Sequence, residues 1–462
     1  MPPNDHINDK KLFIKSYGCQ MNVYDAERMA MQLAPLGFSK TTHPEEADMV
    51  ILNTCHIREK ADDKVFSDIG RLEKLMKRDS ILTLAGCTAQ SIGVEMQKQK
   101  PRIDIVVGTQ NYHRLPQLLE RRLSFKKRIA DIEFPVESKF DYLKEELIMD
   151  NIPVSQFLTI QEGCDKFCSF CVVPYTRGAE SSRPYDAIVK EAKQLTAKGA
   201  REITLLGQNV NGWHGRGQDG KEWNLAKLIN KLSEIDHLWR IRYVTSHILD
   251  MDDDLIAEHR QNKKLQPFLH LPLQSGSDKI LKAMNRGHNM KDYLKIIDKV
   301  TSARPDIALS SDFIVGFPQE DDDDFNQTLS AVKKIGYTAC YSFCYSPRLG
   351  TPAAAMPQIP HDIKMARLQT LQSLLYQQEQ SFNQATIGKT IDILVEKSTN
   401  RYQAKHPLGQ TCQLMGRSPW LQPVHFDGDM SMIGKMIAVK INHSEKHSLF
   451  GELINSHEYA AA

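Results

Sequence analysis

Hydrophobic and polar positions along the first 125 residues switch repeatedly between strand-like and helix-like patterns. The strand-like runs are 12–16, 48–52, 81–85 and 103–107, and the helical patterns are 25–36, 59–77 and 113–122. Strands that alternate with helices pair in parallel, because each crossover helix returns the chain to the same edge of the sheet. We therefore expect an open parallel α/β domain at residues 10–127.

A charged stretch follows this pattern. Residues 128–149 contain Pro135 and show no clear period. We interpret this stretch as a linker.

A second series of strand and helix patterns begins after the linker. Its strand-like runs are 157–161, 202–206, 241–245, 268–273, 308–315 and 338–345, with helical patterns at 184–198, 290–303 and 361–383. Spacings of this size suit successive βα units, and six of them predict a partial (β/α)6 barrel at residues 150–383 rather than a closed eightfold one.

The last part of the chain is strand-like again. The runs 390–396, 436–441 and 449–454 are separated by Gly, Pro and Asn. This pattern predicts a small all-β barrel or sandwich at residues 385–455.

Composition narrows the class of protein. The 462 residues suit about three domains, and the 59 Lys and Arg against 57 Asp and Glu give a net charge of +2. This balance argues against disorder and against a histone-like basic coat. No stretch approaches the apolar length of a membrane helix, and the N-terminus lacks the layout of a signal peptide. We expect a soluble cytoplasmic protein.

Nine cysteines without a secretory signal favour reduced thiols over a disulfide framework. Cys164, Cys168 and Cys171 form a C-x3-C-x2-C run just after the first strand of the second series. Three thiolates this close can bind three irons of a 4Fe-4S cube and leave the fourth iron open. The alternative is a zinc site, although structural zinc prefers four ligands. We expect an iron–sulfur cluster here.

Three further cysteines are far apart in sequence. Cys19, Cys55 and Cys87 each follow a strand predicted in the first domain. Because the carboxyl ends of parallel strands meet at one edge of a sheet, the pattern predicts a second three-cysteine cluster site there. The alternative is that each is a small buried apolar residue.

The remaining cysteines carry no such pattern. Cys340 and Cys344 lie four apart in one predicted strand, which separates them by about 13 Å and favours a place in the core or the barrel lining. Cys412 is interpreted as an unpaired thiol.

The motifs around these cysteines resemble those of the methylthiotransferases, a radical S-adenosylmethionine (SAM) family, over essentially the whole chain. Within that family they are most similar to the bacterial branch that acts on isopentenyl-adenosine. The matching segments are 16–22, 53–55, 57–61, 65–66, 172–178, 182–184, 206–211, 271–277 and 310–318.

The resemblance implies a domain layout, cofactors and site residues. It implies two 4Fe-4S clusters on the six cysteines, SAM at the open iron of the barrel cluster, and a C-terminal TRAM domain that binds RNA. It also places Arg177, Glu180 and Arg183 beside SAM. A guanidinium suits the SAM carboxylate, so we favour the two arginines; an ordinary surface loop is the alternative.

Two positions depart from the family pattern. Gln319 follows Gly-Phe-Pro where the family usually has Gly, and His56 follows Cys55 where it usually has Ser. The first position bears on a turn and the second on the surroundings of a cluster ligand.

The resemblance implies methylthiolation at C2 of N6-isopentenyl-adenosine beside the anticodon of tRNA, with two SAM molecules consumed. The implied partners are a tRNA anticodon stem-loop and an electron donor such as a flavodoxin or ferredoxin, and we expect a monomer. Threonylcarbamoyl-adenosine or a ribosomal-protein aspartate remain alternative substrates, since relatives with the same layout modify them. A zinc-binding RNA adaptor is the alternative from a different class of protein.

Overall fold

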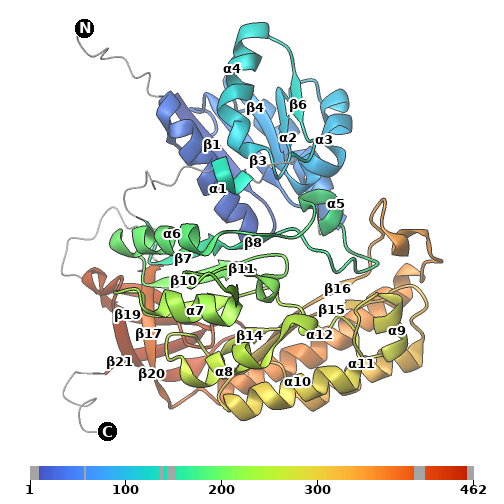
Figure 1. Ribbon diagram of the computed structural model, residues 1–462, viewed down its shortest axis with the longest axis vertical. Coiled ribbons are helices and arrows are strands. Elements are labelled where there is room, and N and C mark those ends of the chain that lie inside the picture. Colours follow the sequence, from blue (N-terminus) through green and yellow to red (C-terminus); the bar gives the residue numbers. More distant parts are fainter. Residues whose placement is uncertain (1–9, 57–58, 136–138, 143–151, 400–410, 455–462) are drawn as a thin grey trace.

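The computed structural model describes residues 10–56, 59–135, 139–142, 152–399 and 411–454. The described chain forms an N-terminal α/β unit above a partial barrel, with a small β-barrel at one side (Figure 1). Parts of three expected segments lie outside the described residues: 57–58 of a cysteine-flanking motif, 136–138 and 143–149 of the linker, and 400–410 and 455 of the terminal region.

The N-terminal unit is built on one parallel sheet of six strands in the order β2-β1-β3-β4-β5-β6. The strands are β1 Lys10–Ser16, β2 Phe38–Lys40, β3 Met49–Thr54, β4 Ile81–Gly86, β5 Ile105–Val107 and β6 Ile129–Asp131. Every residue of β3 and β4 is buried, as expected for central strands covered on both faces. The predicted parallel α/β fold is confirmed.

Helices cover both faces of this sheet. They are α1 Gln20–Leu33, η1 Ala34–Leu36, α2 Glu59–Glu73, α3 Cys87–Gln99, η2 Tyr112–Arg114 and α4 Leu115–Phe125. Apolar residues of α1 and α4 share one core cluster, and those of α2 and α3 share another. The hydrophobic pattern of the sequence did not predict α3, β2 or β6.

Part of the expected linker belongs to the fold. Ile129 pairs with Ile105, so β6 completes the N-terminal sheet, and residues 139–142 form a 3-10 turn, η3, with Lys139 fully buried. A three-residue strand is too short to show a period, and a lysine in a charged stretch gives no sign of burial. The linker interpretation was therefore wrong for these residues.

The central part contains the six predicted parallel strands in chain order. They form two three-stranded sheets, β7-β10-β13 and β14-β15-β16, joined by a bridge between Ile241 and Leu265. The strands are β7 Ser155–Thr159, β10 Glu202–Leu206, β13 Arg240–Tyr243, β14 Phe268–His270, β15 Ala308–Val315 and β16 Ala339–Cys344. The partial-barrel prediction is confirmed at the level of its six strands.

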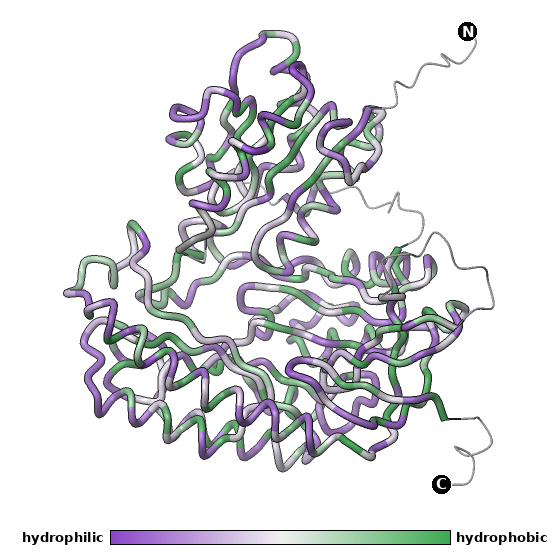
Figure 2. Tube along the Cα trace, turned by 180° about the vertical axis from the view of Figure 1, so that it is seen from behind, coloured by the Kyte–Doolittle hydropathy of each residue, from purple (hydrophilic) through white to green (hydrophobic). Residues whose placement is uncertain are grey.

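Helices and short hairpins surround these strands. They are β8 Gln161–Glu162, α5 Val173–Arg177, β9 Ser181–Ser182, α6 Tyr185–Ala197, η4 Val210–Gly212, β11 His214–Arg216, β12 Glu222–Asn224, α7 Leu225–Ser233, η5 Ile248–Asp250, α8 Asp253–Gln261, α9 Asp278–Ala283, α10 Met290–Ala303, α11 Asp322–Ile335, η6 Pro352–Ala355 and α12 His361–Gln384. Figure 2 shows hydropathy alternating along the outer helices, as amphipathic helices require.

The C-terminal part is a closed five-stranded barrel in the order β17-β18-β19-β21-β20. Its elements are β17 Thr390–Ser398, β18 Thr411–Arg417, β19 Pro423–Asp429, η8 Met430–Met432, β20 Met436–Ser444 and β21 Leu449–Leu453. The hydrophobic pattern of the sequence predicted three of these strands but not β18 or β19.

Two buried arginines join this barrel to the larger one. Arg240 donates to the carbonyls of Arg417 and Asp392, both at 2.7 Å, and Arg242 donates to those of Ser418 and Pro419. The terminal barrel is therefore docked where β10 and β13 begin, at the end of the strands opposite their carboxyl ends.

Within the described residues, no helix has both the length and the apolar character needed to cross a membrane.

Candidate active site

The N-terminal cysteines gather at the carboxyl ends of three neighbouring strands. Cys19 caps α1 just beyond β1, Cys55 follows β3, and Cys87 is the first residue of α3 after β4. Because β1, β3 and β4 are adjacent and parallel, these ends share one edge. The predicted convergence of the three strand ends is confirmed.

Two glycines bring these turns together. Gly18 has φ +87, and a Cβ built there would lie 2.4 Å from the Cys55 Sγ. Gly86 has φ +88, and its Cβ would lie 2.4 Å from the Thr54 carbonyl oxygen. A side chain at either position would push the cysteine-bearing turns apart.

The thiols of this set interact electrostatically. Burial raises the pKa of Cys19, the positive charge of Arg177 opposes that rise, and the neighbouring Cys87 adds to it. Cys55 and Cys87 are buried, whereas Cys19 is half-buried. The set therefore lies beneath the surface with one cation beside it.

The second cysteine set lies in the loop between β8 and α5. Burial, to which the charge of the adjacent Cys168 adds, raises the pKa of Cys164 to about 11 and of Cys171 to about 12. The Val173 N–H donates to the Cys171 Sγ and Arg286 Nη1 donates to the Cys168 Sγ, each at 3.5 Å. The loop thus turns its three thiols toward one another.

The donor chemistry of both sets fits an iron–sulfur cluster. Each set offers three soft thiols, and N–H groups already point at two sulfurs of the second set. Among the residues that the structure describes, no three His, Cys, Asp or Glu side chains lie close enough to bind a single metal ion. A cube distributes its thiolates over different irons, so it takes a wider set than one ion does.

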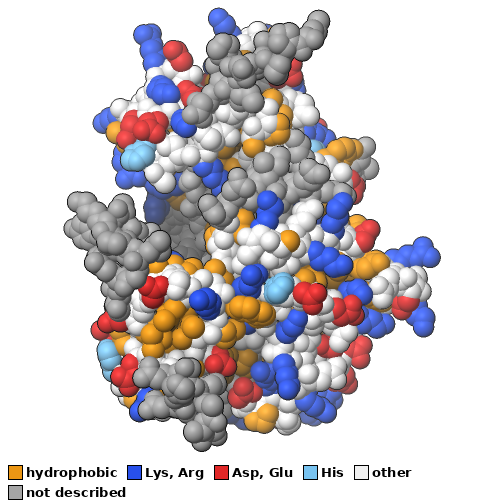
Figure 3. All heavy atoms as spheres, turned by 90° about the vertical axis from the view of Figure 1, so that its left-hand side faces the viewer, with side chains coloured by type: hydrophobic (Ala, Val, Ile, Leu, Met, Phe, Trp, Pro, Cys, Tyr) orange, Lys and Arg blue, Asp and Glu red, His pale blue; other side chains and the backbone are white. Residues whose placement is uncertain are grey.

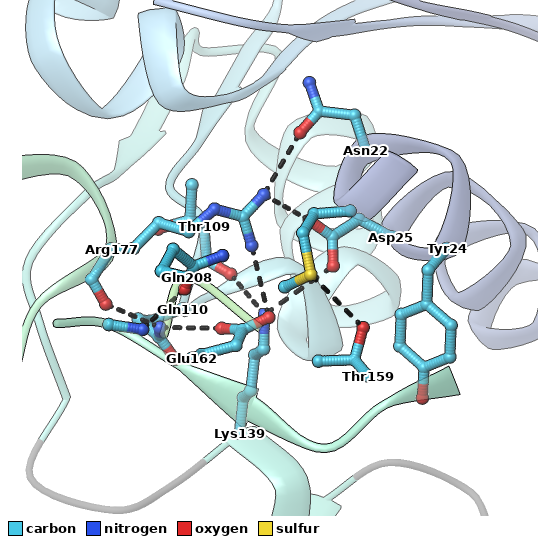
Figure 4. A network of polar contacts seen from close by, with 12 residues as sticks. Asn22, Tyr24, Asp25, Thr109, Gln110, Lys139, Thr159, Glu162, Arg177 and Gln208 are labelled. Atoms are coloured by element: carbon cyan, nitrogen blue, oxygen red, sulfur yellow. Dashed lines mark hydrogen bonds and ion pairs between the residues drawn. The ribbon is translucent and has the colours of Figure 1, made fainter. Parts of the chain in front are cut away.

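A buried charge network connects the two parts of the chain (Figure 4). Arg177 Nη2 lies 2.8 Å from Asp25 Oδ2 and 3.0 Å from Asn22 Oδ1, and its Nη1 lies 3.2 Å from Glu162 Oε1. Lys139 Nζ lies 2.7 Å from the same Glu162 oxygen. Two cations therefore face two carboxylates, which compensates charges that would otherwise be costly to bury.

Arg183 takes part in a second buried contact across the domains. Its Nη2 lies 2.8 Å from Glu191 Oε2, and its Nη1 donates to the Tyr24 hydroxyl at 3.2 Å. Arg28 of α1 also pairs with Glu191. Burial raises the pKa of Tyr24 to about 12, so this hydroxyl is protonated and can donate.

The three residues expected beside SAM have different surroundings in the structure. The guanidiniums of Arg177 and Arg183 are bound to carboxylates at the domain interface. Glu180 is half-buried beside Asn209, and its negative charge acts on Cys164. Glu180, the less favoured of the three, lies beside the loop of the second cysteine set, since its N–H donates to Asp165 Oδ1 at 3.1 Å.

Sequence reasoning missed several residues of this region. Asn22 and Asn209 lie within motifs singled out for their resemblance, but their contacts could not be read from those motifs. No sequence pattern indicated a role for Arg286 or Lys139, because the partners of each are distant in sequence.

The cysteines outside the two sets lie where sequence placed them. Cys340 and Cys344 are half-buried and pack against the barrel core, as expected. Cys412 is a free thiol, as expected, within the core of the terminal barrel. His56 is buried, with its Nε2 3.4 Å from the Ser91 hydroxyl.

Comparison with known proteins gives matches over nearly the whole chain. Residues 11–108 match the model described as "Uncharacterized protein family UPF0004", and residues 158–332 match the radical SAM superfamily. The chain is 51% identical to the tRNA-2-methylthio-N(6)-dimethylallyladenosine synthase of Bartonella bacilliformis and 50% identical to that of Agrobacterium fabrum. Each alignment covers 97% of this chain and 98% of the relative.

Among solved structures, the radical SAM methyltransferase TsrM from Kitasatospora setae, with cobalamin and a 4Fe-4S cluster bound, superposes with a TM-score of 0.57. The match has 13% identity and covers 75% of this chain and 77% of that one. At this identity the likeness concerns the fold alone.

Proposed function

The chain belongs to the family of tRNA-2-methylthio-N(6)-dimethylallyladenosine synthases, and we infer from this that it converts N6-isopentenyl-adenosine in tRNA to the 2-methylthio derivative. The reaction uses SAM and an iron–sulfur cluster, as expected of the radical SAM superfamily. The 51% identity over nearly the full chain is the observation that carries this function.

We propose that each cysteine set binds one 4Fe-4S cluster. A cluster at Cys164, Cys168 and Cys171 would supply the electron that cleaves SAM and so generates the radical that removes hydrogen from C2, whereas one at Cys19, Cys55 and Cys87 would supply the sulfur. The chain itself positions the two sites. Arg177 follows the second set by six residues and is bound to Asn22, three residues after Cys19.

The contacts of Arg177, Glu180 and Arg183 suggest a different role for Glu180 than for the two arginines. We propose that Glu180 contacts SAM directly, because its N–H donates to Asp165 Oδ1, next to Cys164, and its negative charge acts on that cysteine. Arg177 and Arg183 hold the N-terminal unit against the barrel, since both bind groups across the interface.

We propose domains at 10–127, 150–383 and 385–455, with β6 at Ile129–Asp131 added to the first because it completes that sheet, and with the last a TRAM domain that binds RNA. A stack of rings on the terminal barrel supports this role: His425 and His443 stack on Phe450, with centroids 5.2 and 4.7 Å apart. Aromatic surfaces of this kind bind unpaired bases. Acidic and basic side chains are interspersed on the face seen in Figure 3. The proposed RNA binding therefore rests on aromatic stacking rather than on a patch of positive charge.

One experiment tests the activity and the metal together. The reconstituted protein, with SAM and a flavodoxin or ferredoxin as electron donor, is incubated with tRNA carrying isopentenyl-adenosine, and the nucleosides are analysed by mass spectrometry. We expect the 2-methylthio product and about eight irons per monomeric chain. Product only from threonylcarbamoyl-adenosine or from a ribosomal-protein aspartate, or tetrahedral zinc in place of iron, would overturn the proposal.

The RNA-binding role of the terminal barrel is tested in the full chain. Removing the barrel would strip Arg240 and Arg242 of their carbonyl acceptors, so truncation alone does not isolate this role. We expect Phe450→Ala to weaken tRNA binding about fivefold or more at matched salt while SAM cleavage continues. Phe125→Ala, which removes a ring that is 70% exposed on the N-terminal unit, is the control. Equal affinity of the two variants would contradict the role.

A further inference from the structure

The inner face of β16 carries two large aromatic side chains. Cys344 Sγ lies 3.8 Å from the Met365 Sδ of α12, and Cys340 also packs against the core, so these two residues face the covering helix. Side chains alternate between the faces of a strand. Tyr341 and Phe343 therefore stand on the opposite face, toward the interior of the partial barrel.

These rings are exposed although they lie within a strand of a parallel sheet. Tyr341 is 60% exposed and Phe343 is 37% exposed. Strands of such sheets are usually buried on both faces, and neighbouring exposed apolar side chains mark binding surfaces. The two rings, spaced two residues apart, form a surface that a flat apolar ligand can cover.

Polar groups border the rings on the neighbouring strands. Asp312 pairs in register with Tyr341, and His270 pairs with Ser310. Because Ser310 and Asp312 are two residues apart on β15, all four side chains lie on the inner face. His270 Nδ1 lies 2.9 Å from the Ser310 hydroxyl, and its Nε2 lies 3.5 Å from Asp312 Oδ2. The face thus offers hydrogen-bonding groups next to stacking groups.

Arg286 connects this face to the second cysteine set. Its Nη2 donates to the Pro272 carbonyl at 2.7 Å, two residues beyond the end of β14, and its Nη1 donates to the Cys168 Sγ. The carboxyl end of β14, where His270 lies, is therefore held beside the loop at which we place SAM cleavage.

We propose that Tyr341 and Phe343 are the stacking surface for the target adenosine of the tRNA, with Asp312 and His270 at the edge of the base. This inference rests on the proposed function. A base that reacts at C2 must leave its stack in the anticodon loop, and stacking on side chains compensates for that loss. The rings also suit the apolar isopentenyl group, and Ile314, in register with Phe343, extends the apolar surface toward it.

SAM carries an adenine too, so the experiment separates the two sources of that ring. It compares Tyr341→Ala and Phe343→Ala with Tyr341→Phe, which keeps a ring, and with Phe125→Ala, which removes an exposed ring elsewhere. The binding probe is an anticodon hairpin with 2-aminopurine at the target position, whose emission falls when it stacks. The apparent KM for SAM is measured from 5′-deoxyadenosine formation without RNA.

We expect Tyr341→Ala to lower hairpin affinity about fivefold or more and to restore 2-aminopurine emission, with the KM for SAM unchanged. Phe343→Ala should lower affinity in the same direction, whereas Tyr341→Phe and Phe125→Ala should bind like the parent. Unchanged affinity and quenching in both alanine variants would overturn the inference, as would a raised KM for SAM with normal hairpin binding.

These binding measurements need no turnover. Failure of the parent protein to form the methylthio product would therefore refute the proposed function without deciding this inference. Retained iron content and circular dichroism show that the variants fold, which the exposure of Tyr341 favours.

Discussion

The N-terminal cysteine set and the barrel cysteine set each bring three thiols together, but by different means. Cys164, Cys168 and Cys171 come from one loop of eight residues, whereas Cys19 and Cys87 at the ends of the other set are 68 residues apart. The loop needs only local backbone geometry to bring its thiols together. The N-terminal set depends on three parallel strands being in register and on two glycine turns, so its geometry is a property of the whole sheet.

The surroundings of the two sets differ as well. Two of the three N-terminal cysteines, Cys55 and Cys87, are buried and Cys19 is half-buried, whereas all three cysteines of the loop are half-buried. A more accessible set suits a cluster that must be reached by SAM and by an electron donor, and a buried one suits a site that has to exclude water and oxidants. The division of labour proposed above follows this difference.

The largest effect should come from removing the loop set. Replacing Cys164, Cys168 and Cys171 with Ala should abolish 5′-deoxyadenosine formation and the methylthio product, and should lower iron from about eight to about four per chain. Chromatography of the reaction and an iron assay measure both. Cys344→Ser, a change in the same barrel outside the loop, should keep both 5′-deoxyadenosine formation and the methylthio product. Continued SAM cleavage by the triple variant would show that the loop is not the site of radical formation.

Removing the N-terminal set should have a narrower effect. With Cys19, Cys55 and Cys87 replaced by Ala, SAM cleavage should continue while the methylthio product is lost, because radical formation depends only on the loop. Mass spectrometry of tRNA nucleosides, with 5′-deoxyadenosine measured in the same reactions, separates the two outcomes. Methylthiolated nucleoside from this variant would refute the sulfur-donor role.

The two sets also differ in how far sequence could predict them. The C-x3-C-x2-C spacing identifies the loop directly, whereas the N-terminal set required three strand predictions, all of which hold. Neither pattern could show that Arg177 faces Asp25 and Glu162, because Asp25 belongs to the N-terminal unit and Glu162 to another strand, so the contact depends on the tertiary fold. The burial of Lys139 was hidden for the same reason.

The dependence of the N-terminal set on its turns can be tested with Gly86→Ala. The residue has φ +88, and the added Cβ would meet the Thr54 carbonyl at 2.4 Å and the Asn53 Oδ1 at 2.6 Å. With ψ −162 its backbone lies in a region essentially restricted to glycine, which costs another residue about 1–3 kcal/mol, and the collision with main chain adds to that cost. We expect lower iron content and less methylthio product, with SAM cleavage retained.

Gly336→Ala is the matched control for that change. Gly336 has φ +73 at the end of α11 and no atom within 4 Å of an added Cβ, so it carries a left-handed backbone cost of about 1–2 kcal/mol without any collision. It should lower the melting temperature slightly and leave iron content unchanged. Equal iron loss in both variants would mean that general destabilisation, rather than the turn at Cys87, is responsible.

The smallest expected effect concerns Gln319, which follows the carboxyl end of β15 and has φ +75. The chain keeps the left-handed turn that glycine favours, and the position is exposed, so the side chain meets no obstacle of the kind found at Gly18 and Gly86. Gln319→Gly removes about 1–2 kcal/mol of backbone strain but adds about 0.4–1 kcal/mol of unfolded-chain entropy. We expect a gain in unfolding free energy of at most about 1.6 kcal/mol, measured by denaturant titration with iron content unchanged. Gln319→Ala keeps the Cβ and should match the parent within about 0.5 kcal/mol. A loss of stability in the glycine variant would show that the Gln319 side chain itself stabilises this turn. The lack of a steric obstacle would then not be enough to explain why this turn accepts a side chain, whereas the turns at Gly18 and Gly86 do not.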